Sequence, residues 1–370
     1  YTTKNSGGVP ANFKNWFVIE SDTPFEYIRT FADGVLSEKV ESQSSHSGAL
    51  VGFKTEKGQK VSLRVASSFI SIEQAKENLK ELKDGDFDRI KCEGKARWNE
   101  VLGRIMVEDD DIDHLRTFYS CLYRSVLFPR NLSEITSDGK TVHYSPYNGE
   151  IREGYMFTDT GFWDTFRCLF PLLNLVYPDT NVKIQEGLVN AYLESGFLPE
   201  WASPGHRGCM VGNNSASIVA DAYIKGLRGY DIETLWKAVV SDAYAVHPEV
   251  HTTGRLGWKE YNELGYVPCD IGINESAART LEYAYDDWCI YQLGKALGKK
   301  EKELKPFKER AWNYRTLYLK EAGLMCGRKS DGDFSLPLNP YKWGGDFTEG
   351  NALQYTWSVF HDPEGLIRLM

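Results

Sequence analysis

The sequence predicts an α+β protein of more than one domain, in which the last strands of a β-sandwich precede an α/α toroid. Two observations lead to this fold class. Before residue 70, hydrophobic and polar residues alternate in short segments, which is typical of strands with one buried face. After residue 111, hydrophobic residues recur at helical spacing in longer segments that long loops separate.

The expected strands lie at 15–20, 48–54 and 60–70. Turns rich in Gly, Ser and Lys separate them, such as the turn at 56–59. Residues 1–70 are too few for a complete sandwich, which needs about 100 residues. We therefore interpret this segment as the end of an N-terminal β-sandwich domain.

Residues 71–110 are expected to form a helical linker. Ser71 can cap a helix, and acidic residues follow it in the first turn. A second helix is expected over 86–102, with Ile90 and Trp98 on its apolar side.

Helices are expected to dominate residues 111–370, at 111–128, 163–176, 181–195, 214–228, 231–244, 275–297, 301–320 and 350–360. A closed toroid needs more helices than these, so the toroid is expected to be incomplete. The loops that join toroid helices at one rim build the site. The sequence starts without Met and ends on an apolar run with no helix stop, so we interpret it as a piece of a longer protein.

Charge and composition exclude several classes of function. The net charge is −9 and no Lys/Arg run occurs, so nucleic-acid binding is not expected. The apolar stretches fall far short of the about 20 residues of a membrane helix, so no transmembrane segment is expected. Seven dispersed cysteines form neither a zinc motif nor a redox motif. The 13% of aromatic residues suits a carbohydrate-binding cleft, although a large core would use them too.

Two clusters combine Trp with polar side chains. Trp163 and Asp164 start a helix that also carries Arg167. They indicate either a sugar clamp, with a carboxylate for hydroxyl groups and an indole face for C–H surfaces, or a structural Asp–Arg pair. Trp201 lies in a loop bounded by Pro and Gly, where its ring either faces a ligand or anchors the loop. That loop ends at a predicted helix cap, Asn213 or Asn214.

Two acidic clusters are further candidates. Glu282 and Asp286 share a helix face and Asp287 lies on a neighbouring one, so solvent, a cation or Arg residues must offset their repulsion. Glu349 is expected at a helix N-terminus near Trp343 and other aromatic residues. Aromatic surroundings would raise the pKa of its carboxyl group, as a general acid requires, whereas the helix dipole would lower it. The alternatives are an exposed or ion-paired acidic rim for the first cluster and an ordinary helix-start acid for Glu349.

Six collinear segments together resemble glycoside hydrolase family 92, the calcium-dependent exo-acting α-mannosidases. They are FWDTFR at 162–167, CMVGN at 209–213, IVADAY at 218–223, TLEYAYDDW at 280–288, TEGN at 348–351 and HDPEGLI at 361–367. The resemblance implies that residues 111–370 are the N-terminal part of an (α/α)6 catalytic domain. It also implies that the protein hydrolyses terminal α-linked mannose from glycans with inversion of configuration. Such an activity would take part in N-glycan degradation.

Residue roles follow from the resemblance alone. Glu349 matches the general acid. Trp163 and Asp164 match residues of the mannose subsite, to which Trp201, Asn213, Asn214 and Trp343 are expected to contribute. The cofactor is expected to be Ca²⁺, and the general base and most calcium ligands are expected beyond Met370. Asp346 and Asp362 are not assigned as the base.

Two other functions stay open from the residues. One is another α/α-toroid glycosidase, and the other is a calcium-dependent carbohydrate-binding protein without catalysis. Retention of Glu349 favours catalysis over binding alone. The resemblance further implies a periplasmic, cell-surface or secreted location.

Overall fold

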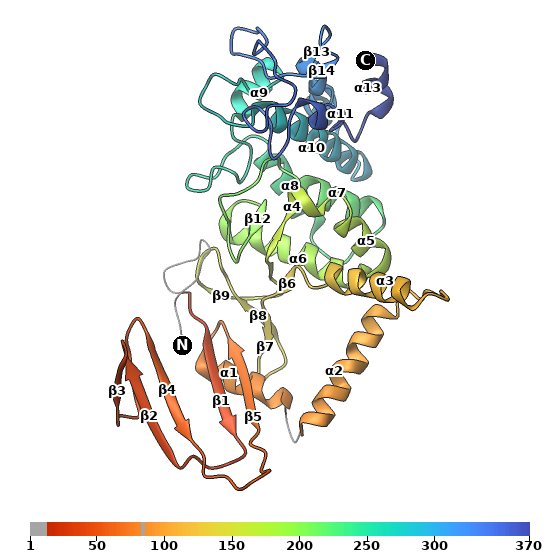
Figure 1. Ribbon diagram of the computed structural model, residues 1–370. Helices are drawn as coiled ribbons and strands as arrows, with labels where there is room; N and C mark the ends of the chain where they lie inside the picture. The colour runs from red at the N-terminus through yellow and green to blue at the C-terminus, as the bar shows by residue number, and fades with distance from the viewer. Residues whose placement is uncertain (1–12, 83–85) are drawn as a thin grey trace. The chain divides into compact units, whose positions relative to one another are not determined.

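A computed structural model describes residues 13–82 and 86–370 (Figure 1). The chain divides into two compact units, Lys14–Val101 and Leu102–Met370, and Phe13 belongs to the second. We describe each unit separately. The expected domain boundaries after residues 70 and 110 stay predictions.

Two small antiparallel sheets make up most of the first unit. β1 (Trp16–Ser21) pairs with β5 (Leu63–Ser68), and β2 (Tyr27–Ala32) lies between β3 (Val35–Ser37) and β4 (Ser47–Gly52). The three expected strands correspond to β1, β4 and β5. The sequence analysis missed the β2–β3 hairpin, although its turn is Asp33–Gly34 with positive φ at both residues. Asp-Gly is a favoured pair for such two-residue turns.

Two helices complete the first unit. α1 (Ile72–Leu79) begins as predicted, because the Ser71 hydroxyl accepts a hydrogen bond from the Gln74 N–H at 3.0 Å. This helix packs against β1 and β5. A 3₁₀ turn, Lys80–Leu82, follows it. α2 (Phe87–Leu102) is exposed or half-exposed along its whole length, and Trp98 on the expected apolar side is 38% exposed.

In the described residues of the second unit, ten α-helices of different lengths follow α3 (Ile112–Ser125). They are α4 (Phe162–Thr165), α5 (Leu169–Val176), α6 (Pro178–Ser195), α7 (Ser215–Ile224), α8 (Ile232–Asp242), α9 (Trp258–Leu264), α10 (Ser276–Ala296), α11 (Glu301–Arg310), α12 (Ala352–Tyr355) and α13 (Pro363–Leu369).

Several of the predicted helix boundaries were wrong. The helix expected over 163–176 is interrupted between α4 and α5, and the one expected over 301–320 ends at Arg310. A 3₁₀ helix, Asn313–Leu317, and a short hairpin of β13 (Tyr318–Leu319) with β14 (Leu324–Met325) follow it. α9 lies inside the predicted loop 246–274. The long apolar runs of the sequence favoured continuous helices, but the chain turns wherever packing against other elements requires it.

The predicted loop 129–162 contains strands. β7 (Ser133–Ile135), β8 (Thr141–Tyr144) and β9 (Ile151–Glu153) form a three-stranded antiparallel sheet. Two further antiparallel pairs of short strands form outside this sheet. β6 (Arg130–Asn131) pairs with β10 (Phe157–Thr158), and β11 (Thr160–Gly161) pairs with β12 (Trp201–Ala202).

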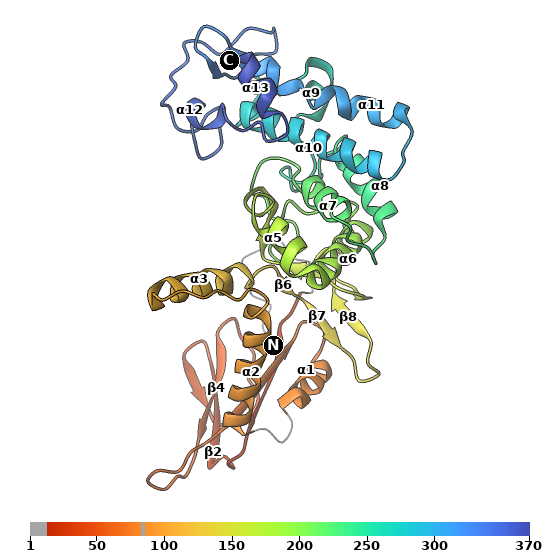
Figure 2. The same ribbon diagram turned by 90° about the vertical axis from the view of Figure 1, so that its right-hand side faces the viewer.

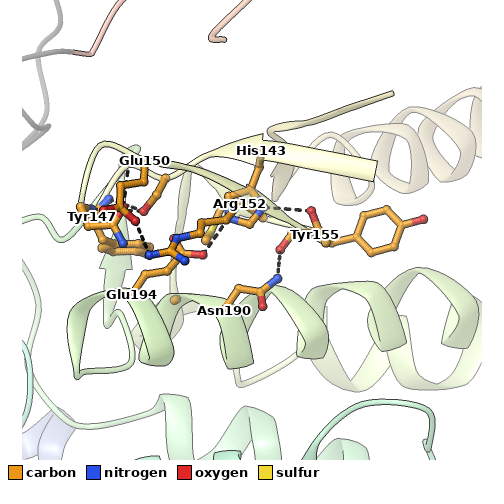
Figure 3. A network of polar contacts seen from close by, with 12 residues as sticks. His143, Tyr147, Glu150, Arg152, Tyr155, Asn190 and Glu194 are labelled. Atoms are coloured by element: carbon orange, nitrogen blue, oxygen red, sulfur yellow. Dashed lines mark hydrogen bonds and ion pairs between the residues drawn. The ribbon is translucent and has the colours of Figure 1, made fainter. Parts of the chain in front are cut away.

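Buried polar contacts fasten this sheet to α6 (Figure 3). The His143 ring is fully buried, with Nδ1 2.9 Å from the Gly154 carbonyl oxygen and Nε2 2.8 Å from Oε1 of Glu194 on α6. Asn190, one turn earlier on α6, donates to the Tyr155 carbonyl oxygen at 2.9 Å. Each contact satisfies a polar group that burial would otherwise leave unpaired.

α10 is the central helix of the second unit. It packs against α7, α8 and α11 (Figures 1 and 2), and most of its residues are buried. Its first half also contributes to a hydrophobic cluster with Phe347, Tyr355 and Leu366. A helix buried on nearly all sides places any polar side chain it carries inside the protein. Among the helices formed by the described residues, none combines the length and the apolar character that crossing a bilayer demands.

Candidate active site

The three acids of α10 are buried. Glu282 is 1% exposed, and Asp286 and Asp287 are fully buried. A solvated rim is therefore the wrong interpretation of this cluster. A buried carboxylate needs hydrogen bonds or a cation, and each of the three has such partners.

Two arginines hold Asp287. Arg255 Nη1 lies 2.7 Å from Oδ1, and Arg310 Nε lies 2.8 Å from Oδ2. The hydroxyl group of Tyr261 is a third donor, 3.2 Å from Oδ2. Packing against Arg was one of the compensations considered for this cluster, and it is confirmed here. Because both carboxylate oxygens are engaged, Asp287 supports the site rather than facing a ligand.

Glu282 connects the first Trp cluster to α10. Its Oε1 accepts hydrogen bonds from Trp163 Nε1 at 3.2 Å and from Arg167 Nη2 at 3.4 Å, and its Oε2 accepts one from Asn214 Nδ2 at 3.0 Å. Burial raises the pKa of Glu282, and the Arg167 guanidinium opposes that shift. This carboxylate orients the Trp163 indole ring, which the family resemblance assigns to the mannose subsite.

Asp286 lies beside the helix cap of α7. It accepts hydrogen bonds from the Asn213 N–H at 2.7 Å and from Asn214 Nδ2 at 3.3 Å. Burial raises the pKa of Asp286 well above its usual range, and the nearby Glu282 and Glu200 carboxylates add to the shift. The two asparagines thus join α7 to the acids of α10.

The sequence analysis missed Glu200. It is 1% exposed and accepts hydrogen bonds from Asn213 Nδ2 at 2.8 Å and from the Ser215 hydroxyl at 2.6 Å. Burial raises the pKa of Glu200 to about 7, and the bonds to Ser215 and Asn213 limit the shift. The one signal in the sequence was its position directly before Trp201, inside a segment that already stood out.

Glu200→Gln is expected to remove a pH dependence of stability. Because the folded-state pKa of Glu200 is above its unfolded value, the stability that Glu200 contributes is lost as pH rises from about 4.5 to about 7. Glutamine does not titrate. The free energy of unfolding of the variant should therefore rise relative to that of the wild type over this pH range, by at most about 3 kcal/mol. Urea unfolding at several pH values between 5 and 8 measures the difference. Glu301→Gln, at an exposed position on α11, is the control, and a difference that stays flat with pH contradicts the prediction.

The first two Trp clusters meet through a pair of short strands. β11 pairs with β12, so that Gly161 lies opposite Trp201. A Cβ atom at residue 161 would lie 2.2 Å from Cε3 of the Trp201 ring, so only glycine allows this approach. Trp201 itself is half-buried. The predicted residues Trp163, Trp201, Asn213 and Asn214 are therefore neighbours in the fold, linked by β11–β12 and by the buried carboxylates.

Other predicted residues lie at the surface. Asp164 is exposed in the first turn of α4, and the side chain of Trp343 is 64% exposed. Asn213 and Asn214 are fully buried, with their amide groups directed at Glu200 and Glu282.

The surroundings of Glu349 differ from those expected. Its side chain is exposed rather than enclosed by aromatic rings, and the helix expected over 350–360 is the shorter α12, Ala352–Tyr355, which begins three residues after Glu349. The helix starts later because Asn351 and Gln354 form a reciprocal capping box that fixes the first helical residue as Ala352. Glu349 has a positive φ of 47°, which is uncommon outside glycine and is found at functional sites.

Calcium does not fit the carboxylates that the structure describes. Within residues 13–82 and 86–370, no three His, Cys, Asp or Glu side chains gather in a way that could hold a metal ion. The buried acids bind Arg, Asn, Ser and Trp donors instead. These residues by themselves do not make a calcium site.

Glycoside hydrolases act through paired carboxyl groups, and this unit places a buried carboxylate, Glu282, beside the Trp163 indole ring. A comparison with protein families supports this class. The model of the glycosyl hydrolase family 92 catalytic domain matches residues 74–370. The chain belongs to this family.

Solved structures of the family are similar to this chain. One is a family GH92 inverting mannosidase from Bacteroides thetaiotaomicron VPI-5482, with 45% identity, a TM-score of 0.97, and coverage of 99% of this chain and 50% of that one. Another is a family GH92 α-mannosidase from Bacteroides thetaiotaomicron in complex with mannoimidazole, with 30% identity, a TM-score of 0.82, and coverage of 96% and 49%.

A curated relative is an uncharacterized secreted glycosidase from Arthroderma benhamiae. It is 28% identical over 273 residues, which are 70% of this chain and 30% of the relative. The chain thus spans about half the length of the matched structures and less of this relative.

Proposed function

We propose that the protein is an inverting exo-α-mannosidase that releases terminal α-linked mannose from glycans. The observation that carries this proposal is the likeness over nearly the whole chain to an inverting mannosidase, at 45% identity. The network of Glu282, Trp163 and Asn214 supports it, because it holds an indole ring and polar groups beside each other. Such a combination suits a sugar, which has both C–H faces and hydroxyl groups.

Glu349 would be the general acid. In an inverting mechanism, one carboxylic acid protonates the departing oxygen while a carboxylate on the opposite face activates water, about 6.5–9.5 Å away. An exposed carboxyl group on a loop of unusual backbone geometry suits a residue that must reach the leaving group. We assign the general base to the part of the protein that follows Met370.

The mannose subsite would combine the remaining predicted residues. Trp163 would cover an apolar face of the sugar, and Asp164 would accept hydrogen bonds from its hydroxyls. Asn213 and Asn214 would form the floor of the subsite through their link to the buried acids. Trp201 and Trp343 would extend its aromatic wall.

Calcium remains part of the proposal, with its ligands mostly after Met370. A calcium ion takes oxygen ligands and would bind hydroxyls of the reacting sugar.

We also propose that the strands of the first unit end a β-sandwich and that the helices of the second unit belong to an (α/α)6 toroid. A location outside the cytoplasm, at the cell surface, in a periplasm or secreted, is supported by the description of the curated relative as secreted.

Mannose release from a panel of α-linked mannobioses tests the function. The complete protein, with the sequence that follows residue 370, is expected to release mannose when calcium is present and to lose this activity in excess chelator. The 370-residue chain alone is expected to show no calcium-dependent shift in its melting temperature, because no three His, Cys, Asp or Glu side chains within residues 13–82 and 86–370 gather around a place for a metal ion.

Absence of release by a folded complete protein would contradict the proposal. Release of another hexose from the matching disaccharide would favour a different toroid glycosidase. Binding of mannosides without turnover would favour a carbohydrate-binding protein.

A further inference from the structure

The loop that carries Glu349 rests on the first turn of α10. The Gly345 carbonyl oxygen accepts a hydrogen bond from the Glu275 N–H at 2.8 Å. The Asp346 carbonyl oxygen accepts two more, from Ala277 N–H at 3.0 Å and Ala278 N–H at 3.1 Å. The first N–H groups of a helix have no partner within it, so this loop satisfies groups that would otherwise stay unpaired.

The side chain of Asp346 reinforces this contact. Its Oδ1 accepts a hydrogen bond from the Ser276 hydroxyl, the first residue of α10, at 3.3 Å. The N-terminus of a helix favours a negative charge. Burial raises the pKa of Asp346, whereas Ser276 and Lys342 lower it.

Gly327 provides the space that the Asp346 carboxyl group occupies. A Cβ atom at residue 327 would lie 2.3 Å from Oδ2 of Asp346 and 2.6 Å from its Cγ. The backbone of Gly327 is outside the left-handed region, so glycine is required for space and not for conformation. The Gly327 carbonyl oxygen accepts a hydrogen bond from the Ser335 N–H at 2.8 Å, which fixes this strand-like segment in place.

The residues between Asp346 and Glu349 connect the position of Asp346 to that of Glu349. Phe347 and Thr348 are only 5% and 7% exposed, and Phe347 packs in the cluster that includes Tyr355. A hydrogen bond from the Gly344 N–H to the Gly350 carbonyl oxygen, at 2.9 Å, closes the loop. Because the buried part of this short loop is packed, a displacement of Asp346 shifts the backbone that carries Glu349.

We propose that Asp346 and Gly327 are positioning residues for Glu349: the Asp346 carboxyl group, in the space that Gly327 leaves, fixes loop 344–350 on α10 and thereby sets where the Glu349 carboxyl group lies. The inference rests on the proposed function, in which Glu349 protonates the leaving group. In this proposal neither residue binds the sugar, and both act through Glu349.

Gly327→Ala in the complete protein tests this role. The added methyl group displaces the Asp346 carboxyl group, and a misplacement of about 1 Å costs about 10²-fold in rate. We expect a loss of about that size in kcat/KM for a mannoside with a poor leaving group. An activated aryl mannoside needs little protonation, so its kcat/KM should fall by less than about threefold.

A double variant separates positioning from a general defect. In a Glu349→Gln background, Gly327→Ala is expected to leave the ratio of the two substrate rates unchanged, because the acid whose position matters is gone. Gly94→Ala is the matched control, since a Cβ atom there meets nothing within 4 Å. This control should change neither rate.

Equal losses on both substrates by Gly327→Ala would overturn the inference, and so would a change in the ratio of the two substrate rates when Gly327→Ala is added to the Glu349→Gln background. If Gly327→Ala does not fold, Ser276→Ala replaces it, because it removes only the hydroxyl group bound to Asp346. It should give the same pattern at a smaller size, and an effect equal on both substrates again overturns the proposal. A wild type that releases no mannose would contradict the proposed function instead.

Discussion

Asp287→Asn is expected to lower the free energy of unfolding of the unit Leu102–Met370 by about 3–5 kcal/mol. The substitution takes from the buried Arg255 and Arg310 the carboxylate that both of them contact, and an amide offers one acceptor and no charge. The loss is a large share of the about 5–15 kcal/mol that stabilises a typical protein. The effect is large because Asp287 is fully buried and its carboxylate accepts hydrogen bonds from both guanidinium groups.

Urea unfolding followed by tryptophan fluorescence measures this loss. Asp179→Asn is the matched control, because the Asp179 side chain is 85% exposed and lies 3.8 Å from Arg104. An exposed ion pair of this kind contributes below about 1 kcal/mol. If Asp287→Asn costs no more than the control, the buried ion pairs do not support the fold.

Glu349→Gln is expected to lower kcat/KM of the complete protein by about 10²–10⁴-fold for a mannoside with a poor leaving group. Glutamine has nearly the same shape as glutamate but has no acidic proton to transfer. An activated aryl mannoside should lose much less, because its leaving group departs without protonation. Steady-state rates on a series of mannosides with graded leaving groups measure the effect.

Glu321→Gln is the control for this variant, since Glu321 is an exposed acid of the same unit. It should leave every rate unchanged. An equal loss by Glu349→Gln across the leaving-group series would assign Glu349 to substrate binding, and no loss at all would remove it from the site.

Local features of the sequence predicted much of the fold. The start of α1 follows from Ser71, whose hydroxyl satisfies a free N–H of the first turn. β1 and β5 follow from the alternation of hydrophobic and polar residues, and α10 follows from its long helical period. These signals are local, so a short segment of sequence is enough to recognise each of them.

Parts of the site depend on contacts that are far apart in the sequence. Glu282 meets Trp163 across 119 residues and Asn214 across 68. The sequence showed that the acids of α10 need compensation, but it did not identify Arg255 and Arg310 as partners of Asp287. Glu200 was missed for the same reason, since its partners Asn213 and Ser215 follow it after a loop.

The sequence by itself determined the family, through six short segments in a fixed order, and the type of most long elements. Only the tertiary structure decided which acids are buried, which Trp rings face carboxylates, and that Glu349 lies exposed before α12. The physical reason is that periodicity and capping act over a few residues, whereas burial and ion pairing depend on which distant side chains share the same interior.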